Sequence, residues 1–223
     1  MSTSPGPSAE LRARVLAAAS AEPVANRSVG LARRAAVVAV GMVLSVLVLA
    51  YIGGPQPDGR PVAYFLTIAA LWTAVVLAAS WGGLGRGKSM LGRPTSVRLI
   101  VAALTPAALI VATLLAGLCW PATISEPSNI HDHLLCIELG SLMAIGPLVA
   151  FAFVRRDSDP VAPRLTGAAL GAVAGAWGGL FIELRCGHCS VEHVVLGHVV
   201  PVVVFALAGA LIAGSVITVR HRK

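Results

Sequence analysis

Residues 99–120, LIVAALTPAALIVATLLAGLCW, form an apolar run in which no side chain is charged. Such a run is long enough to cross a bilayer, because roughly 20 apolar residues of helix span the hydrocarbon core. Five other stretches are also long and apolar. The stretch 165–182 is slightly short, and Glu138 and His198 each interrupt one of the others. The five stretches cover residues 35–54, 62–81, 134–154, 165–182 and 194–219. Lipid leaves free backbone groups unsatisfied, whereas a helix bonds its own, so the sequence predicts an all-α integral membrane protein, a six-transmembrane-helix bundle.

The composition agrees with a membrane protein. The mean hydropathy is +0.83 and charged residues make up 12% of the chain. A soluble domain carries about twice that share of charged residues. The formal net charge of +7 would by itself suit a protein that binds nucleic acid. The positions of the charges along the chain argue against that function.

Nearly all the basic residues fall on one side of the predicted membrane. Five precede the first span, four lie between the second and third, three between the fourth and fifth, and three follow the sixth, which makes 15 of 17. Only Arg60 and Arg185 lie on the opposite side. Under the positive-inside rule the basic side is cytoplasmic, so both termini are inside and three short loops face out. We expect the basic loops to contact membrane lipid head groups and predict no direct contact with nucleic acid.

The sequence divides into an arm, a membrane domain and a tail. These are the cytoplasmic N-terminal arm 1–34, the six-helix membrane domain 35–219 and the basic cytoplasmic tail 220–223. Within the arm, residues 9–21 have the pattern of a short amphipathic helix, which Pro23 ends. Leu11 and Val15 lie on its apolar face and Arg12 lies off that face. The helix either lies on lipid or docks into a cytoplasmic partner, and these three residues are our partner-binding candidates.

Four glycines recur at every fourth position in the fifth predicted span. They are Gly167, Gly171, Gly175 and Gly179. Because glycine has no side chain, they leave a flat groove where another helix can approach closely and gain van der Waals contact. We favour packing within the chain over the alternative, a homodimer.

All four cysteines and five of the six histidines are predicted at the outer face. They are Cys119, His131, His133, Cys136, Cys186, His188, Cys189, His193 and His198. The segment CGHCSVEH, from Cys186 to His193, has the ligand types and the C-x₂-C spacing of a zinc or copper site. Thiolates and imidazoles bind Zn²⁺ and Cu⁺ well. The charged residues Glu138, Glu183 and Arg185 are close to this layer, either as partners of the histidines or as interfacial charges.

Three kinds of site remain open for these residues. A metal site would take its ligands from Cys136, Cys186, His188, Cys189, His193 and His198. A structural or regulatory disulfide is the second kind, since the outer compartment of a bacterium is oxidising, and four cysteines allow three connectivities. The third is a set of thiols that react with oxidants, with Cys136, Cys186 and Cys189 as the redox-active residues. Zn or Cu at this cluster is the one cofactor that the sequence suggests, and we assign no catalytic residue.

The second half of the chain contains several distinctive segments. They are Cys136 at the head of a span, RRDSDP at 155–160, LTGAALGAVAGAWGGL at 165–180, ELRC at 183–186 and LGHVVP at 196–201. Together they resemble the NrsF family, whose members are six-span bacterial inner-membrane proteins regarded as anti-sigma factors for extracytoplasmic-function sigma factors. The resemblance implies that this chain holds such a sigma factor at the membrane until an outer signal arrives.

The family pattern includes paired outer cysteines, and Cys136 and Cys186 match those positions. The resemblance implies nothing for His188, Cys189, His131 or His133, which look like additions in this chain.

Two functions fit the sequence. The leading interpretation is a membrane anti-sigma factor without enzymatic activity, in which outer Cys and His residues sense a metal or redox signal. The alternative is a membrane thiol oxidoreductase that passes electrons to a quinone. That enzyme would use Cys186 with Cys189 as one pair and Cys119 with Cys136 as the other.

Overall fold

The structure is a computed structural model that describes residues 8–10, 13–14, 17, 27–56, 60–85, 94–121, 129–156 and 161–216. The chain divides into two compact units, Met1–Ala35 and Ala36–Lys223. In the first unit, Arg14 donates a hydrogen bond to Glu10 at 2.7 Å, one helical turn away. Leu11, Arg12 and Val15, the predicted partner-binding residues, lie outside the described part of the chain.

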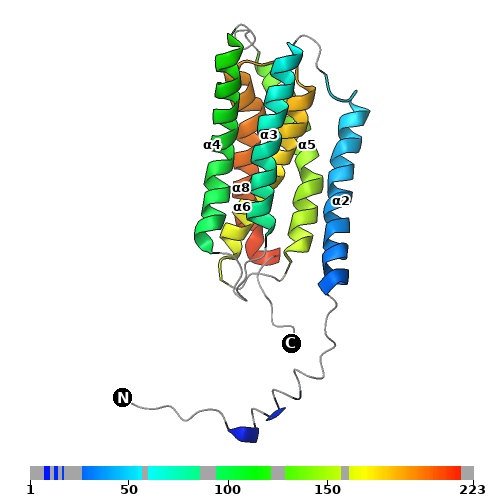
Figure 1. Ribbon diagram of the computed structural model, residues 1–223, viewed down its shortest axis with the longest axis vertical. Coiled ribbons are helices and arrows are strands. Elements are labelled where there is room, and N and C mark those ends of the chain that lie inside the picture. The colour runs from blue at the N-terminus through cyan, green and yellow to red at the C-terminus, as the bar shows by residue number, and fades with distance from the viewer. Residues whose placement is uncertain are drawn as a thin grey trace, which may run out of the picture. The chain divides into compact units, whose positions relative to one another are not determined.

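The second unit is a bundle of long helices that run side by side (Figure 1). The long helices are α2 (Arg27–Tyr51), which begins in the first unit, α3 (Val62–Leu84), α4 (Thr95–Cys119), α5 (Ile130–Val154), α6 (Pro163–Arg185) and α8 (Val200–Val216). A short helix α7 (Val191–His193) and a π-helix η2 (Val194–Val199) lead directly into α8. Every regular element in the described residues is helical. The structure therefore confirms the prediction of an all-α fold.

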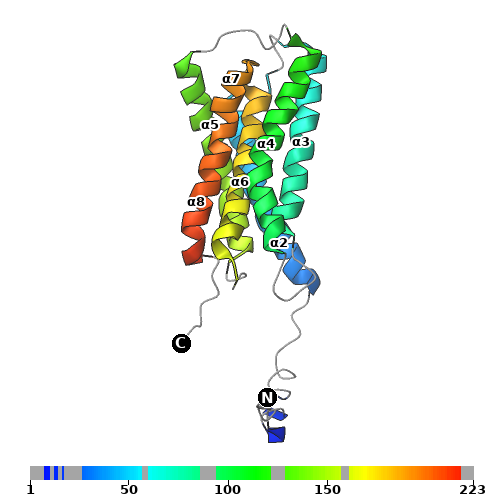
Figure 2. The ribbon, with the colours of Figure 1, turned by 90° about the vertical axis from the view of Figure 1, so that its left-hand side faces the viewer.

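Six helical segments are long and apolar enough to cross a membrane, and α7, η2 and α8 together supply the sixth. The helix α6 is the centre of the bundle, with neighbours on several sides (Figure 2). Within the bundle, 83% of its span is buried, compared with 17% for α2 and 39% for α5. Insertion in a membrane and the side on which the termini lie stay predictions.

The glycines of α6 explain how it reaches the centre. A Cβ at Gly171 would collide with the carbonyl oxygen of Phe205, and one at Gly167 with that of Gly209, both in α8. The backbones of α6 and α8 are thus in direct contact, as is possible only where side chains are missing. This confirms the prediction that the glycine face packs within the chain.

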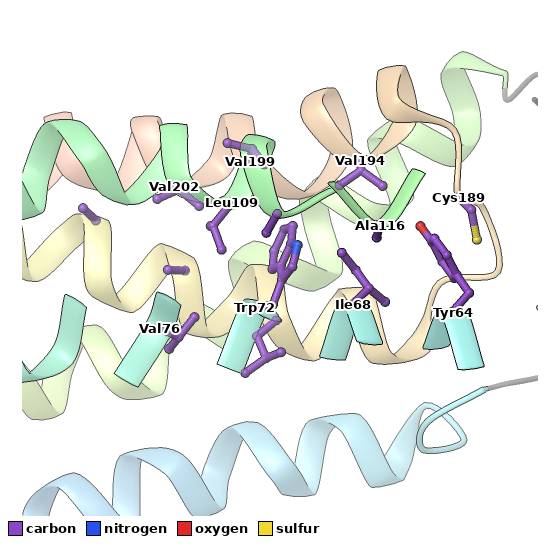
Figure 3. Close-up of a cluster of buried hydrophobic side chains, with 14 of the residues drawn as sticks. Tyr64, Ile68, Trp72, Val76, Leu109, Ala116, Cys189, Val194, Val199 and Val202 are labelled. Carbon is purple, nitrogen blue, oxygen red and sulfur yellow. The ribbon is translucent and has the colours of Figure 1, made fainter. Parts of the chain in front are cut away.

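Aromatic and aliphatic side chains fill the space between α3 and its neighbours. Tyr64, Ile68, Trp72 and Val76 follow one another at four-residue intervals and share one face of α3 (Figure 3). All four are fully or almost fully buried. The indole N–H of Trp72 donates to the Thr113 hydroxyl at 3.3 Å, which satisfies a polar group that would be costly to bury alone.

Most of the cysteines and histidines gather at one end of this bundle. There α2, α4 and α6 end and α3, α5 and α7 begin (Figure 1). We call it the cysteine end, and it comprises residues 52–61, 119–136 and 183–198 where these are described.

Candidate functional site

Four elements bring cysteine and histidine side chains together at the cysteine end. The helix α5 contributes Cys136 from its second turn, and Cys186 is the residue that follows α6. His193 is the last residue of α7, and His198 belongs to η2. All four are buried. We call these four residues the Cys/His cluster.

The distances in the cluster are short enough for the four residues to bind one metal ion together, or for the two cysteines to form a disulfide. One ligand atom from each of the four residues lies within 4.8 Å of all the others. The Cys136 thiol donates to the Cys186 sulfur at 3.5 Å, and the Cys186 sulfur is 3.2 Å from Nε2 of His193. Two sulfurs and two imidazoles form the ligand set of tetrahedral zinc sites and also suit Cu⁺.

Capping interactions fix the starts of α5 and α7, which carry Cys136 and His193. Asn129 and Asp132 form a capping box at the start of α5, in which the Asp132 amide donates to the Asn129 side chain at 3.1 Å. At α7, the Ser190 hydroxyl accepts a hydrogen bond from the amide of His193 at 3.3 Å. These caps position Cys136 and His193 through the backbone.

The π-helix aligns the two histidines. They are five residues apart, and in an α-helix this spacing would turn one about 140° away from the other around the axis. The wider turn of η2, in which the Val200 amide donates to the carbonyl of Val195, reduces that angle. The rings of His193 and His198 consequently lie 5.3 Å apart, edge to face. Pro201 supplies a cause, because proline lacks an N–H and crowds the preceding turn, which π-type adjustments relieve.

A buried carboxylate holds His198. Oε2 of Glu183 lies 2.7 Å from Nδ1 of His198, and Oε1 of Glu183 lies 3.5 Å from Nη1 of Arg60. The side chains of all three are almost completely buried. A carboxylate on one nitrogen of a histidine orients the other nitrogen toward a metal.

An unpaired nitrogen of His198 makes the cluster a receptive site. Nε2 of His198 has no hydrogen-bond partner in the described structure, and the ring lies close to the Cys186 thiol. Because Nδ1 of His198 is held by Glu183, its Nε2 is the atom available for a ligand. Buried polar atoms are almost always paired, so an unpaired one needs an explanation. A bound soft metal would supply that partner, and the donor set fits one.

Other predicted site residues lie around the cluster or away from it. The rings of His133 and His188 each lie 4.9 Å from the ring of His193, and His188 also reaches Asp132 at 3.5 Å. The Cys189 thiol donates to the carbonyl of Gly187 at 3.6 Å. Cys189 packs with Tyr64 and Val194 in a different group of buried side chains from Cys136 and Cys186 (Figure 3). Cys119, His131 and Glu138 are exposed.

The pKa values of two thiols, that of Cys186 in the cluster and that of Cys189 beside it, are raised, which favours the neutral form. The hydrogen bond with Cys136 and then burial raise the pKa of the Cys186 thiol above its ordinary value, against the opposing effect of His193. Burial raises the pKa of Cys189 to about 11. A metal that binds as a thiolate complex therefore has to displace protons.

Sequence reasoning did not identify Arg60, which lies outside the Cys/His cluster and contacts the carboxylate that holds His198. Its side chain is fully buried and contacts Glu183, although it lies in a loop and more than 120 residues away in the chain. One signal was available in the sequence. Arg60 and Arg185 are the two basic residues predicted on the outer side, where the other 15 Lys and Arg residues do not occur.

The comparisons with known proteins agree with the resemblance noted in the sequence. The family model described as NrsF, negative regulator of sigma F, matches residues 17–218. No curated protein and no solved structure matches the chain. Since the family match covers nearly the whole sequence, this chain belongs to the NrsF family of negative regulators of sigma F.

Proposed function

We propose that this protein is a membrane-bound anti-sigma factor of the bacterial inner membrane. It sequesters an extracytoplasmic-function sigma factor and releases it when the Cys/His cluster meets a metal or redox signal from the envelope. The observation that carries the proposal is the buried set of Cys136, Cys186, His193 and His198, whose ligand atoms lie within 4.8 Å of one another.

The distribution of charge supports the orientation. The basic segments favour a cytoplasmic location for both termini and for the 1–34 arm, on the side where a sigma factor is available. The same orientation exposes the cysteine end to the envelope. The proposed partner-binding surface then comprises the arm, with Leu11, Arg12 and Val15, and the basic loops predicted on the same side of the membrane.

Metal binding is one chemical form of the signal. Cys136 and Cys186 would bind Zn²⁺ or Cu⁺ as thiolates after losing their protons, and His193 and His198 would complete four ligands. Apparent binding free energies of structural zinc sites are about 10–16 kcal/mol. Shifting a two-state equilibrium from 1:99 to 99:1 takes about 5.5 kcal/mol of differential affinity. A metal would switch the bundle if its binding free energy differed between the two states by about 5.5 kcal/mol, which is less than half of the total for many such sites.

Oxidation is the other form of the signal. The two thiols of Cys136 and Cys186 and one molecule of hydrogen peroxide yield one disulfide and two molecules of water. The two sulfurs would move from 3.5 Å to about 2.05 Å, the length of a disulfide bond. This movement pulls the start of α5 toward the end of α6.

The thiol oxidoreductase remains the alternative function, but no specific observation favours it. That enzyme would pair Cys186 with Cys189 and Cys119 with Cys136. The contact found in the cluster is instead between Cys136 and Cys186. We therefore propose a regulator that is not an enzyme.

The test uses the purified full-length protein in lipid vesicles with its sigma factor bound. Addition of Zn²⁺, Cu⁺ or hydrogen peroxide should release the sigma factor from the wild-type protein. Release should be lost in the double variant Cys136→Ser, Cys186→Ser and retained in Cys119→Ser, which changes an exposed thiol outside the cluster. Equal release from the double variant would reject the cluster as the sensor, and absence of sigma-factor binding by the wild-type protein would reject the anti-sigma function.

A further inference from the structure

The helix α2 makes little contact with the rest of the bundle along its length. Only 17% of its span is buried, the smallest share among the six candidate spans. Its contacts with the bundle follow one face of the helix. The Gly41 backbone meets that of Gly146, and the Ser45 hydroxyl donates to the carbonyl of Met143 at 2.7 Å. Leu49, one turn further on, is buried in the same group of side chains as Cys136 and Cys186. In the sequence, α2 begins within the 1–34 arm that we propose binds the sigma factor and continues beyond it.

Polar contacts at the cysteine end attach the segment after α2 to α6. The Gln56 amide donates to the carbonyl of Leu184 at 2.9 Å. In the opposite direction, Nε of Arg185 donates to the carbonyl of Ile52 at 3.0 Å. The end of α2 is therefore bonded to the last turn of α6, next to Cys186.

Arg60 adds a charged contact to this attachment. Its Nη1 donates to the carbonyl of Glu183 at 3.1 Å and lies 3.5 Å from the Glu183 carboxylate. Its Nη2 donates to the carbonyl of Gln56 at 2.7 Å. One guanidinium thus connects the segment after α2 to Glu183, and its planar fork allows it to bind both at once.

The Glu183 carboxylate is shared between that arginine and the Cys/His cluster. One oxygen contacts Arg60, and the other holds Nδ1 of His198 at 2.7 Å. When Nε2 of His198 binds a metal, or when the cluster is rearranged by a disulfide, the charge and position of the imidazole change. The contact between the Glu183 carboxylate and Arg60 then has to change in distance or strength, because both ions are buried and neither can be solvated by water instead.

We propose that Arg60 and Glu183 couple the state of the Cys/His cluster to α2 and, through α2, to the affinity for the sigma factor. They are positioning residues and bind neither the metal nor the sigma factor. The proposal rests on the proposed function and adds to it the route by which the signal leaves the cluster. Coupling between two ligands is reciprocal, so a metal that weakens sigma-factor binding must itself be bound more weakly when the sigma factor is present, by the same factor.

The experiment measures this coupling factor in the full-length protein with Co²⁺ as the probe, since its absorption reports thiolate ligands directly. Co²⁺ affinity is measured with and without bound sigma factor in the wild-type protein, Arg60→Gln and Glu183→Gln. Wild-type protein should show a factor of roughly 5–150, the usual range of allosteric coupling. In Arg60→Gln, the Co²⁺ spectrum and the sigma-factor affinity without metal should be retained, whereas the coupling factor should fall to about 1.

A second measurement does not depend on the sigma factor. Hydrogen exchange in residues 52–56 should change when the wild-type protein binds Co²⁺, because the Gln56 amide is bonded to α6. The same exchange should not respond to Co²⁺ in Arg60→Gln. The control is Glu138→Gln, which removes an exposed carboxylate of α5 at the same end and should leave both readouts unchanged.

The outcomes separate this coupling from the proposed function. A wild-type protein that binds Co²⁺ with a change in exchange but does not bind a sigma factor would overturn the proposed function alone. A coupling factor equal to that of the wild-type protein in both Arg60→Gln and Glu183→Gln would overturn the proposal that these two residues couple the cluster to α2. If Arg60→Gln does not form the Co²⁺ site, the same measurements are made on Arg60→Lys. Lysine keeps the positive charge but lacks the planar guanidinium that contacts two groups at once. Loss of the site in that variant as well would show that Arg60 serves only to fold the cysteine end.

Discussion

Gly197 packs directly against two ligands of the Cys/His cluster. A Cβ at this position would lie 3.1 Å from Cβ of Cys136 and 3.5 Å from Nε2 of His193. Gly197→Ala should therefore push Cys136 aside by a few tenths of an ångström, whereas the distance from the added Cβ to His193 is an ordinary van der Waals contact. We expect metal affinity to fall by about 10- to 100-fold, the usual cost of disturbing the surroundings of a metal ligand. Titration of the purified protein with Co²⁺ measures this change.

The control is Gly187→Ala in the adjacent loop, where an added Cβ has no atom within 4 Å. Its metal affinity should equal that of the wild-type protein. Equal affinity in Gly197→Ala would mean that the four ligands do not bind one ion together.

The protonation of Cys186 gives metal binding a pH dependence. Its pKa is raised from the ordinary value of 9.0, first by the hydrogen bond with Cys136 and then by burial, so the thiol is protonated at pH 7. Binding must displace that proton, and the apparent metal affinity should rise about tenfold per pH unit for each proton displaced. An indicator dye in weakly buffered solution should record acidification when Zn²⁺ is added. Binding without proton release, and with an affinity independent of pH between 6 and 8, would contradict thiolate ligation.

At the scale of elements, the contact between α6 and α8 depends on glycine. Leucine at position 171 would overlap the backbone of Phe205, and neither helix can move far in the packed bundle. Forcing extra volume into a packed core costs typically about 1–3 kcal/mol, and more where the obstacle is backbone. Gly171→Leu should lower both the thermal unfolding temperature in detergent and the amount of protein in the membrane. The control is Ala103→Leu on the exposed face of α4, and a decrease of equal size there would show that the effect is not specific to this contact.

The elements also show which parts of the site the sequence could predict. Hydropathy predicts six helices because each needs a long apolar run, and helices α2 to α6 and the α7–α8 segment occupy those runs with shifts of a few residues. The C-x₂-C spacing did not predict which cysteine joins the cluster. Cys186 faces α5 and Cys189 faces α3, since the chain turns between them. The π-turn that aligns His193 and His198 has no signal in the sequence beyond the nearby Pro201.

At the scale of the whole molecule, the account requires both termini on one side of the membrane. A reporter fused after Lys223 should be active only in the cytoplasm, and one inserted near Ser128 should report the opposite side. The physical reason is the position of 15 of the 17 basic residues on one side, since such loops are retained in the cytoplasm. Cytoplasmic activity at the second site would contradict the six-span arrangement.

The pairing of Arg60 with Glu183 shows why the rest could not be predicted. The two residues are 123 positions apart, and their contact exists only because the segment after α2 lies on the end of α6. A single sequence places both near the same face by counting spans, which is how Glu183 entered the set of candidates. It contains no information on which charges meet, because that depends on how the helices pack.

The central claim is that the chemical state of the Cys/His cluster decides whether the sigma factor is held. The most direct test measures sigma-dependent transcription in cells that carry the wild-type chain or the double variant Cys136→Ser, Cys186→Ser, before and after exposure to Zn²⁺, Cu⁺ or hydrogen peroxide. The wild-type chain should give induction with at least one of these signals, and the double variant should give a constant output, either always repressed or always released. Induction of wild-type amplitude in the double variant, with every signal that acts on the parent, would contradict the claim.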